Sequence, residues 1–343
     1  MKHTVVVTGG AGYIGTHTIV DLVSHGYNVI CIDNFSRSNR LIIPRLQQLV
    51  GTSARFITAD LTDVAKLDAV FREIAPVVSI IHFAAFKSVP ESLADPVLYY
   101  HNNISTLLNV IRLGCQYGLK NFVFSSSCSV YGDIESLPVS ESTTLSDPKS
   151  PYAATKVFGE RIVLDSSNAY GFNAVSLRYF NPVGAHESGL IGELSSNPPD
   201  NLFPIITSNL SGRRSKVLVF GSDLPTRDGT CIRDYVHVSD IAKAHTLALD
   251  RLSCTSYNYD QINLGTGRGI TVLEAIHAFE NASSKQVNYE FAPPREGDVV
   301  SIFTDSSKAH SVLNWSPTYD LHDMVSTAWN WELQISSFIP NQT

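Results

Sequence analysis

The chain has 343 residues, of which 43% are hydrophobic and 17% charged, and its formal net charge is −7. This composition is typical of a folded globular protein with a large core and a second lobe, and it excludes a disordered chain. The acidic balance and the absence of a basic run disfavour nucleic acid and anionic membrane as main partners.

The five cysteines are scattered and form no Cys-x-x-Cys pair. Their spacing argues against both a zinc site and a disulfide framework, so we expect a reduced, cytoplasmic setting. The histidines form no ligand cluster, and we expect no metal. The apolar stretch at residues 4–8 is short and leads into glycines, and no apolar run approaches the roughly 18 residues of a membrane span. The sequence therefore predicts neither a signal peptide nor a transmembrane helix.

The first half of the chain alternates between strand patterns and helix patterns. We predict strands at residues 4–8, 28–32, 55–58, 77–83, 121–124 and 174–179. We predict helices at residues 13–25, 41–50, 64–74, 96–117 and 151–170. Because continuous apolar strands alternate with helices, we expect an α/β fold of the Rossmann type, with a doubly wound parallel sheet covered by helices on both faces.

The residue pattern changes after Asn181-Pro182-Val183-Gly184, where closely spaced prolines and glycines separate short elements. This pattern indicates a smaller, mixed α/β lobe. Later helices are expected at residues 239–252, 271–281, 305–313 and 321–332, and a strand at 261–264. We therefore expect a first domain at residues 1–180 and a substrate lobe at 181–343, with residues 235–264 returning to the first domain.

The segment Gly9-Gly10-Ala11-Gly12-Tyr13-Ile14-Gly15 follows the first predicted strand and opens the first helix. Glycines at its first, fourth and seventh positions let the backbone turn tightly and approach a pyrophosphate at the helix N-terminus. Asp33 ends the second strand, where a carboxylate bonds a ribose 2′-hydroxyl and repels a 2′-phosphate. The context favours NAD binding over an ordinary glycine-rich turn, with Arg37 and Arg40 as surface loop residues rather than NADP contacts.

Asp60 and Leu61 lie at the end of the third predicted strand. At that place they could reach the adenine of a dinucleotide. They could equally be the N-cap region of the next helix, and the residues alone leave both interpretations open.

The most informative stretch is Tyr152-Ala153-Ala154-Thr155-Lys156, because Tyr152 and Lys156 share one face of a predicted helix. Lowering the pKa of a phenol from about 10 to near 7 requires roughly 4 kcal/mol. One positive charge a few Å away supplies about 3–4 kcal/mol at an effective dielectric of 20. Each residue alone would be structural, but beside a dinucleotide motif the pair predicts a proton abstractor next to a hydride acceptor.

Ser125-Ser126-Ser127 follows the apolar part of the fifth predicted strand. On its own, such a run indicates a strand exit with hydroxyl-stabilised turns. The carboxyl ends of parallel strands are where α/β proteins bind ligands. Together with Tyr152 and Lys156, Ser127 is therefore predicted to orient the substrate.

Long segments resemble the UDP-glucose 4-epimerases, a group of the extended short-chain dehydrogenase/reductase family. The resemblance covers nearly the whole chain and is carried by residues 7–15, 81–87, 124–127, 130–132, 150–152, 177–186, 228–230, 233–235 and 294–298. Residues 178–186 (Arg-Tyr-Phe-Asn-Pro-Val-Gly-Ala-His) and 295–298 (Arg-Glu-Gly-Asp) are far more specific than the motifs shared with other relatives. Ala85 and the pair Cys128-Ser129 depart from the family pattern but remove no required proton donor.

The resemblance implies NAD contacts at Gly9, Gly12, Tyr13, Ile14, Gly15, Asp33, Asn34, Asp60, Leu61, Phe83, Ala84, Lys87, Asn102, Ser127, Tyr152, Lys156 and Tyr179. It implies UDP-sugar contacts at Asn181, Asn201, Leu202, Phe220, Arg233, Arg295 and Asp298, with Ile302 beside the sugar 2-substituent. The arginines suit this role, because a guanidinium fork matches a diphosphate. The first domain would thus bind NAD, and the lobe the UDP-sugar.

The implied activity is the reversible inversion at C4 of UDP-galactose and UDP-glucose, a step of galactose metabolism, through a 4-keto intermediate and tightly bound NAD. Tyr152 takes the proton of the sugar 4-hydroxyl, Ser127 bonds the 4-oxygen, and Lys156 lowers the pKa of Tyr152 and holds the nicotinamide ribose. The resemblance also implies a homodimer built from helices such as residues 96–117 and 151–170.

Three rival functions follow from the same fold. In sugar-nucleotide 4,6-dehydratases, the segment before Val-Tyr-Gly resembles Thr-Asp-Glu, and in UDP-glucuronate decarboxylases a Glu stands there. This chain has Ser127-Cys128-Ser129 at that place and lacks these carboxylates. A catalytically dead NAD sensor would lose the Tyr/Lys pair, which this chain keeps.

Overall fold

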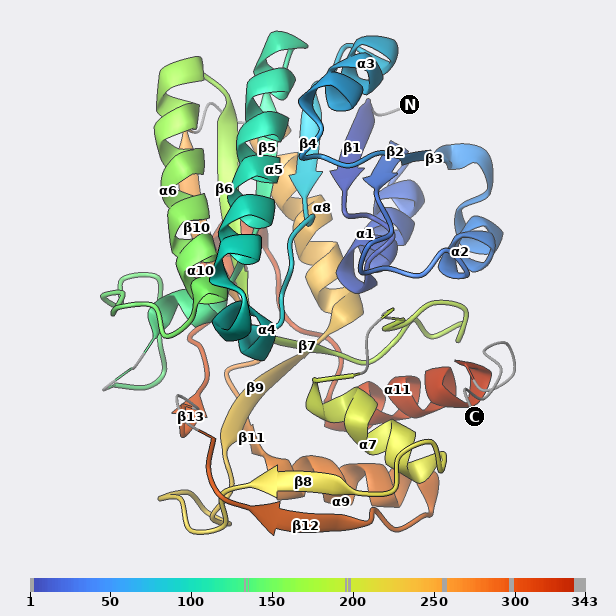
Figure 1. The fold of residues 1–343 in the computed structure, drawn as a ribbon, viewed down its shortest axis with the longest axis vertical. Helices are drawn as coiled ribbons and strands as arrows, with labels where there is room; N and C mark the ends of the chain where they lie inside the picture. The colour runs from blue at the N-terminus through green and yellow to red at the C-terminus, as the bar shows by residue number, and fades with distance from the viewer. Residues whose placement is uncertain are drawn as a thin grey trace.

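A parallel sheet of seven strands, ordered β10-β6-β5-β4-β1-β2-β3, forms the upper part of the molecule in Figure 1. The computed structural model describes residues 3–132, 134, 136–194, 196, 199–254, 258–295 and 299–335. The strands are β1 (Thr4–Thr8), β2 (Asn28–Asp33), β3 (Ala54–Thr58), β4 (Ser79–His82), β5 (Asn121–Ser127), β6 (Asn173–Tyr179) and β10 (Tyr259–Leu264). The strand order reverses between β1 and β4, and ligands bind at the carboxyl ends of strands at such a point.

Helices cover both faces of this sheet, which confirms the predicted Rossmann-type fold. One layer comprises α1 (Tyr13–Ser24), α2 (Ile42–Val50) and α8 (Val238–Cys254), and the other α3 (Val64–Ile74), α5 (Pro96–Gln116) and α6 (Pro151–Tyr170). Along β1, Val5 and Val7 pack into the first layer and Val6 into the second. Because side chains alternate along a strand, a run of valines supplies both cores.

The lower part of Figure 1 holds the shorter elements. Strand β9 (Ile232–His237) pairs with β7 (Asn181–Val183), β11 (Gly269–Thr271) and β13 (Ser301–Ile302), and β8 (Val217–Phe220) pairs with β12 (Tyr289–Ala292). Helices α7 (Leu202–Leu210), α9 (Val272–Ser283) and α11 (Leu321–Ile335) share a separate hydrophobic cluster there. Helix α10 (Ser307–Leu313) instead packs near β10 and α8.

Several elements depart from the predicted boundaries. Strand β5 runs to Ser127, beyond the predicted end at residue 124, and β4 begins at Ser79 rather than at residue 77. The predictions left out α4 (Val89–Ala94), α7, β7, β8, β9, β11, β12 and β13. Helix α4 has six residues, too few to show a helical period, although its Ser88 cap is visible in the sequence.

No helix among the described residues is long and apolar enough to cross a membrane. In the same residues, no group of three or more histidine, cysteine, aspartate or glutamate side chains could hold a metal ion. All five cysteines, which the structure describes, are free thiols.

Candidate active site

Helix α6 presents Tyr152 and Lys156 toward the end of β5. The Ser150 hydroxyl caps the helix by accepting a hydrogen bond from the Ala153 N–H at 3.2 Å, and Pro151 occupies the first turn. Tyr152 therefore stands at the start of the helix, and Lys156 lies one turn further along. The Lys156 Nζ donates to the Ser125 carbonyl at 2.6 Å and lies 5.8 Å from the centroid of the Tyr152 ring.

Burial determines the protonation states of Tyr152 and Lys156 by shifting both of their pKa values. It raises the pKa of Tyr152 to about 12, although a hydrogen bond from Ser127 and the charge of Lys87 act in the opposite direction. Burial also lowers the pKa of Lys156 to about 8, against the charge of Glu160, which raises it. At neutral pH the protein alone therefore holds a neutral phenol and an ammonium.

In the protein alone, the charge of Lys156 does not bring the pKa of Tyr152 toward neutrality. The ammonium directs a short hydrogen bond to the Ser125 carbonyl, and desolvation of the phenolate outweighs the charges nearby. A further positive charge beside the Tyr152 oxygen is needed to bring its pKa toward neutrality.

Ser127 and Tyr179 lie near Tyr152 and Lys156, at the ends of the neighbouring strands β5 and β6. They are paired in the register of β5 and β6. The Ser127 hydroxyl accepts the Ser129 N–H at 3.2 Å, and the Tyr179 hydroxyl contacts that of Ser125. The structure thus brings Ser127, Tyr152, Lys156 and Tyr179 together.

The glycine-rich turn lies close to the exit of β4. Gly9 has φ +67°, and a Cβ there would lie 2.6 Å from the Ala84 nitrogen. A Cβ at Gly15 would lie 2.6 Å from the Gly10 Cα. Helix α1 begins after Gly12 with no side-chain cap. The turn therefore needs glycine, and the uncapped N–H groups of Tyr13 and Ile14 suit an anion.

Asp33 holds the glycine-rich turn against the end of β2. Its carboxylate accepts hydrogen bonds from the Ala11 N–H at 3.1 Å, the Phe35 N–H at 2.8 Å and the Ser38 hydroxyl at 2.9 Å. A carboxylate has about four acceptor sites, so roughly one remains for a ribose hydroxyl. Burial raises the pKa of Asp33, and these hydrogen bonds oppose the rise.

The next residues around this edge also contact one another. Asn34 donates to the Asp60 carboxylate at 3.0 Å, and Asp60 also accepts from the Thr62 N–H at 2.8 Å. Asp60 does not cap α3, because Asp63 does so through the Lys66 N–H. Leu61, next to Asp60, is buried.

The two loop arginines have partners within the protein. Arg37 pairs with Glu91 at 2.6 Å and lies over the Phe86 ring. Arg40 lies over the Phe35 ring, 4.0 Å from its centroid.

Lys87 and Asn201, from the two parts of the molecule, meet at one carboxylate. Glu193 accepts from the Lys87 Nζ at 2.7 Å and from the Asn201 amide at 3.0 Å. Asn201 precedes α7, which starts at Leu202. Sequence analysis missed Glu193, since it lies in an irregular segment and its partner Lys87 is 106 positions away.

Asn103 is a second residue that the sequence analysis missed. Its side chain bonds the Phe86 N–H at 2.8 Å, the Phe86 carbonyl at 3.0 Å and the Thr155 hydroxyl at 3.1 Å. It also accepts from the predicted contact Asn102 at 2.9 Å. Asn103 therefore ties the loop after β4 to α6. Phe83, in the same loop, packs against the His245 ring.

The predicted substrate contacts lie in the lower part of the molecule. The Asn181 Oδ1 atom is buried and has no hydrogen-bond partner, as expected for an atom that bonds a ligand. Arg233 and Ile302 are register partners on β9 and β13. The Arg295 guanidinium lies 4.4 Å from the centroid of the Phe220 ring. Asp298 lies outside the described residues.

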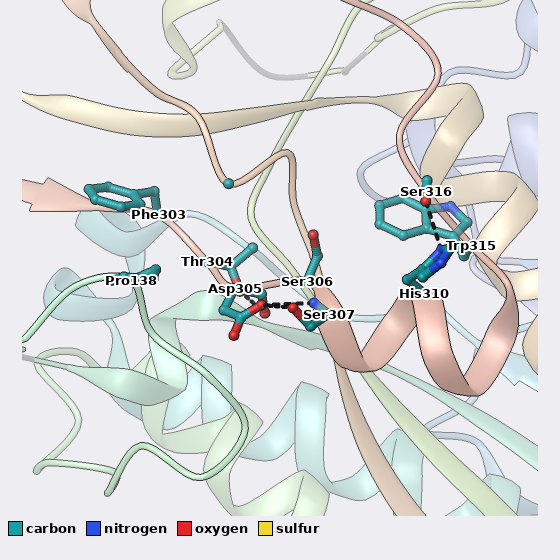
Figure 2. A pocket seen from close by; sticks show the side chains of 10 residues that line it. Pro138, Phe303, Thr304, Asp305, Ser306, Ser307, His310, Trp315 and Ser316 are labelled. Atoms are coloured by element: carbon teal, nitrogen blue, oxygen red, sulfur yellow. Dashed lines mark hydrogen bonds between the residues drawn. The ribbon is translucent and has the colours of Figure 1, made fainter.

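A cavity of about 500 Å³ lies near β13 and α10, apart from this constellation. Its lining side chains are drawn in Figure 2. Its lining includes Pro138, Thr304, Asp305, His310 and Trp315. Tyr152, Lys156 and Ser127 are not among its lining residues. The cavity is therefore not the place where the predicted catalytic residues meet.

The comparisons with known proteins agree on one family. A family model described as GDP-mannose 4,6 dehydratase matches residues 6–328. A UDP-glucose 4-epimerase from Dictyostelium discoideum is 43% identical over 96% of this chain and 95% of that relative. The chain belongs to the UDP-glucose 4-epimerases of the extended short-chain dehydrogenase/reductase family. The resemblance seen in the sequence is thereby confirmed.

Solved UDP-glucose 4-epimerases have the same fold. One from Stenotrophomonas maltophila, with bound NAD and formylated UDP-arabinopyranose, is 40% identical, with a TM-score of 0.93 over 98% of this chain and 99% of that one. Another from Bifidobacterium longum, in complex with NAD+ and UDP, is also 40% identical, with a TM-score of 0.93 over 96% of this chain and 98% of that one.

Proposed function

We propose that this protein is an NAD-dependent isomerase that interconverts UDP-glucose and UDP-galactose by inverting C4 of the sugar, as part of galactose metabolism. The observation that carries this proposal is the meeting of Tyr152 and Lys156 with Ser127 at the end of β5, at the same edge of the sheet as the glycine-rich turn after β1. We further propose that residues 1–180 and about 235–264 bind NAD and that the rest of residues 181–343 bind the UDP-sugar.

The residues present fit NAD. The uncapped start of α1 suits a pyrophosphate, and Asp33 retains acceptor capacity for a ribose. Bound NAD+ supplies a hydride acceptor and a positive charge. The cofactor contacts proposed from the sequence stay as given above, with Lys87, Asn102 and Tyr179 lining the side of the site near Tyr152.

The chain's own residues would then act as follows. Tyr152 takes the proton of the sugar 4-hydroxyl while C4 loses hydride, and it later returns the proton to the 4-oxygen when hydride comes back to the opposite face of C4. Ser127 bonds the 4-oxygen and passes the proton between it and Tyr152. Lys156 stabilises the phenolate. Arg233 and Arg295 hold the diphosphate while the sugar turns. Because the hydride taken from C4 returns to C4, the reaction has no net redox change.

A 4,6-dehydratase is the second candidate, because the matching family model bears that description. Residues 127–129 are Ser, Cys and Ser, so the acid and base that eliminate water are missing there. Incubation with UDP-galactose without added NAD, followed by sugar-nucleotide chromatography, separates the candidates. UDP-glucose indicates the epimerase, a 4-keto-6-deoxy product the dehydratase, and binding without conversion a sensor.

The first prediction concerns the cofactor. Denaturation of the purified protein should release about one NAD(H) per chain, because a closed hydride cycle keeps its cofactor. Gly9→Ala should lower this content severalfold, since its Cβ would collide with the Ala84 backbone. Gly26→Ala is the matched control: its glycine also has a positive φ, but nothing lies within 4 Å of its Cβ. Empty wild-type protein that consumes free NAD+ at each turnover would contradict the proposal.

The second prediction concerns the base. Tyr152→Phe should reduce kcat by about a hundred- to ten-thousand-fold, because it removes the proton acceptor at the 4-oxygen. Binding of UDP, measured by calorimetry, should be retained because the proposed contacts Asn181, Arg233 and Arg295 are unchanged. Tyr170→Phe, at the exposed end of the same helix, is the control. Near-normal turnover by Tyr152→Phe would remove Tyr152 from the mechanism.

The third prediction concerns sugar choice. Ile302 is 6% exposed and packs with Val130, Tyr131, Val139 and Phe180, which makes the wall beside it stiff. UDP-glucose and UDP-galactose should be the main substrates, and UDP-N-acetylglucosamine a poor one. Ile302→Gly should raise the rate on the acetylated sugar relative to UDP-glucose, even as the cavity lowers stability.

Val139→Ala, in the same cluster, is the control for the loss of stability alone. Equal rates of the wild-type protein on both sugar pairs would remove Ile302 as the residue that sets sugar choice.

The fourth prediction concerns assembly, since we also propose a cytoplasmic homodimer. Helices α5 and α6 pack together and leave apolar side chains exposed: Val97 at 74%, Leu108 at 47% and Phe158 at 50%. Such a face fits a second copy of the chain. Light scattering should find a dimer that Leu108→Glu dissociates, whereas Phe291→Glu, on the 49% exposed β12 residue, leaves it intact. A wild-type monomer would contradict this assignment.

A further inference from the structure

Glu160 lies one helical turn after Lys156 on α6, and its side chain is buried. Its carboxylate accepts two hydrogen bonds from Arg178 on β6, from Nε at 2.8 Å and from Nη2 at 2.6 Å. It accepts a third from the Ser126 hydroxyl at 2.5 Å. Arg178 is 2% exposed, so this ion pair lies wholly inside the protein.

These contacts bind α6 to β5 at two successive residues. Lys156 holds the carbonyl of Ser125, and Glu160 holds the hydroxyl of Ser126, which is fully buried. The next residue along β5 is Ser127. The position of Ser127 relative to Tyr152 is therefore fixed by the two charged side chains that follow Tyr152 on its own helix.

The groups that face Lys156 from the surrounding elements are otherwise uncharged. His82 on β4 is neutral, because burial and the charge of Lys156 lower its pKa to about 3. Tyr179 on β6 is neutral, because burial raises its pKa. Phe124 on β5 offers its ring face 5.2 Å from the Nζ atom. Tyr152 on α6 is a phenol, which leaves Glu160 as the one anion facing Lys156 among the described residues.

Glu160 in turn has its own counter-charge. Arg178 neutralises it from the far side and also donates to the Tyr131 hydroxyl at 3.2 Å. The line Lys156, Glu160, Arg178 thus alternates in sign. Removing the middle charge leaves two cations in one interior, whereas removing the last leaves an anion beside Lys156.

We propose that Glu160, backed by Arg178, is a positioning residue for epimerisation, which fixes the end of β5 through Ser126 and keeps the Lys156 ammonium in place beside Tyr152. This inference rests on the proposed function, because its readout is epimerase turnover. It assigns Glu160 no contact with substrate or cofactor.

The test is the pH dependence of kcat with UDP-galactose in three variants. Activity needs a protonated Lys156, so kcat should fall as pH rises through the Lys156 pKa. Glu160→Gln removes the charge that raises this pKa, so the alkaline limb should move to lower pH by about one unit. Arg178→Gln strengthens the field of Glu160, so the limb should move to higher pH. Glu160→Asp keeps the charge and should restore the limb toward wild type.

Glu332→Gln is the matched control. Glu332 on α11 is buried and paired with Arg213 at 2.6 Å, in the lower part of the molecule. Its loss should lower stability and leave the alkaline limb unmoved. If Glu160 had only a structural role, its variants would likewise lose stability without any shift of the alkaline limb. The inference is therefore overturned if Glu160→Gln and Arg178→Gln both fold and both keep the alkaline limb at the wild-type pH.

If one variant fails to fold, the sign of the shift in the other decides. If neither folds, Ser126→Ala, which changes no charge, should lower kcat at unchanged KM, because the end of β5 loses its fixed position relative to Tyr152. A normal kcat for Ser126→Ala then overturns the inference. A wild-type protein without turnover instead refutes the proposed function, and the two failures are thereby distinguished.

Discussion

The burial of the Lys156 ammonium is the constraint around which the site is arranged. A cation inside a protein must be compensated, and here a backbone carbonyl, an aromatic ring and the Glu160 carboxylate share that task. The carbonyl belongs to Ser125, so the charge also fixes the strand end that carries Ser127. The contacts that compensate the Lys156 charge therefore also align the Ser127 hydroxyl with Tyr152.

The same burial explains why the phenol stays protonated. Tyr152 and Lys156 both lose hydration, and each shifts toward its neutral form. The positive charge of a bound oxidised cofactor would act on both: it favours the phenolate of Tyr152 and disfavours the ammonium. The Glu160 carboxylate stabilises the Lys156 ammonium, so the lysine stays charged while the cofactor favours the phenolate of Tyr152.

Much of the fold could be predicted from the sequence because its long elements have strong local signals. The glycine-rich turn, the capped start of α6 and the valine run of β1 are visible without tertiary information. The helices α9 and α11 of the lower part were predicted, but its short strands could not be, because β7, β11 and β13 have two or three residues each and exist only through pairing with β9. At the site, spacing predicted the Tyr152 and Lys156 pair. The pKa of Tyr152 depends on desolvation, which spacing does not reveal, and the bridge through Glu193 joins residues more than a hundred positions apart.

The late position of β10 in the sequence has a consequence for synthesis. This strand pairs with β6, whose last residue precedes it by 80 positions, and α8 packs on α1, whose last residue precedes α8 by 214 positions. Until residue 264 leaves the ribosome, one edge of β6 has no partner, and the apolar face of α1 lacks the helix that covers it. Such edges and faces attract other chains, so the nascent protein passes through a stage at which chaperones would bind it, and folding is slow because the contacts are long-range.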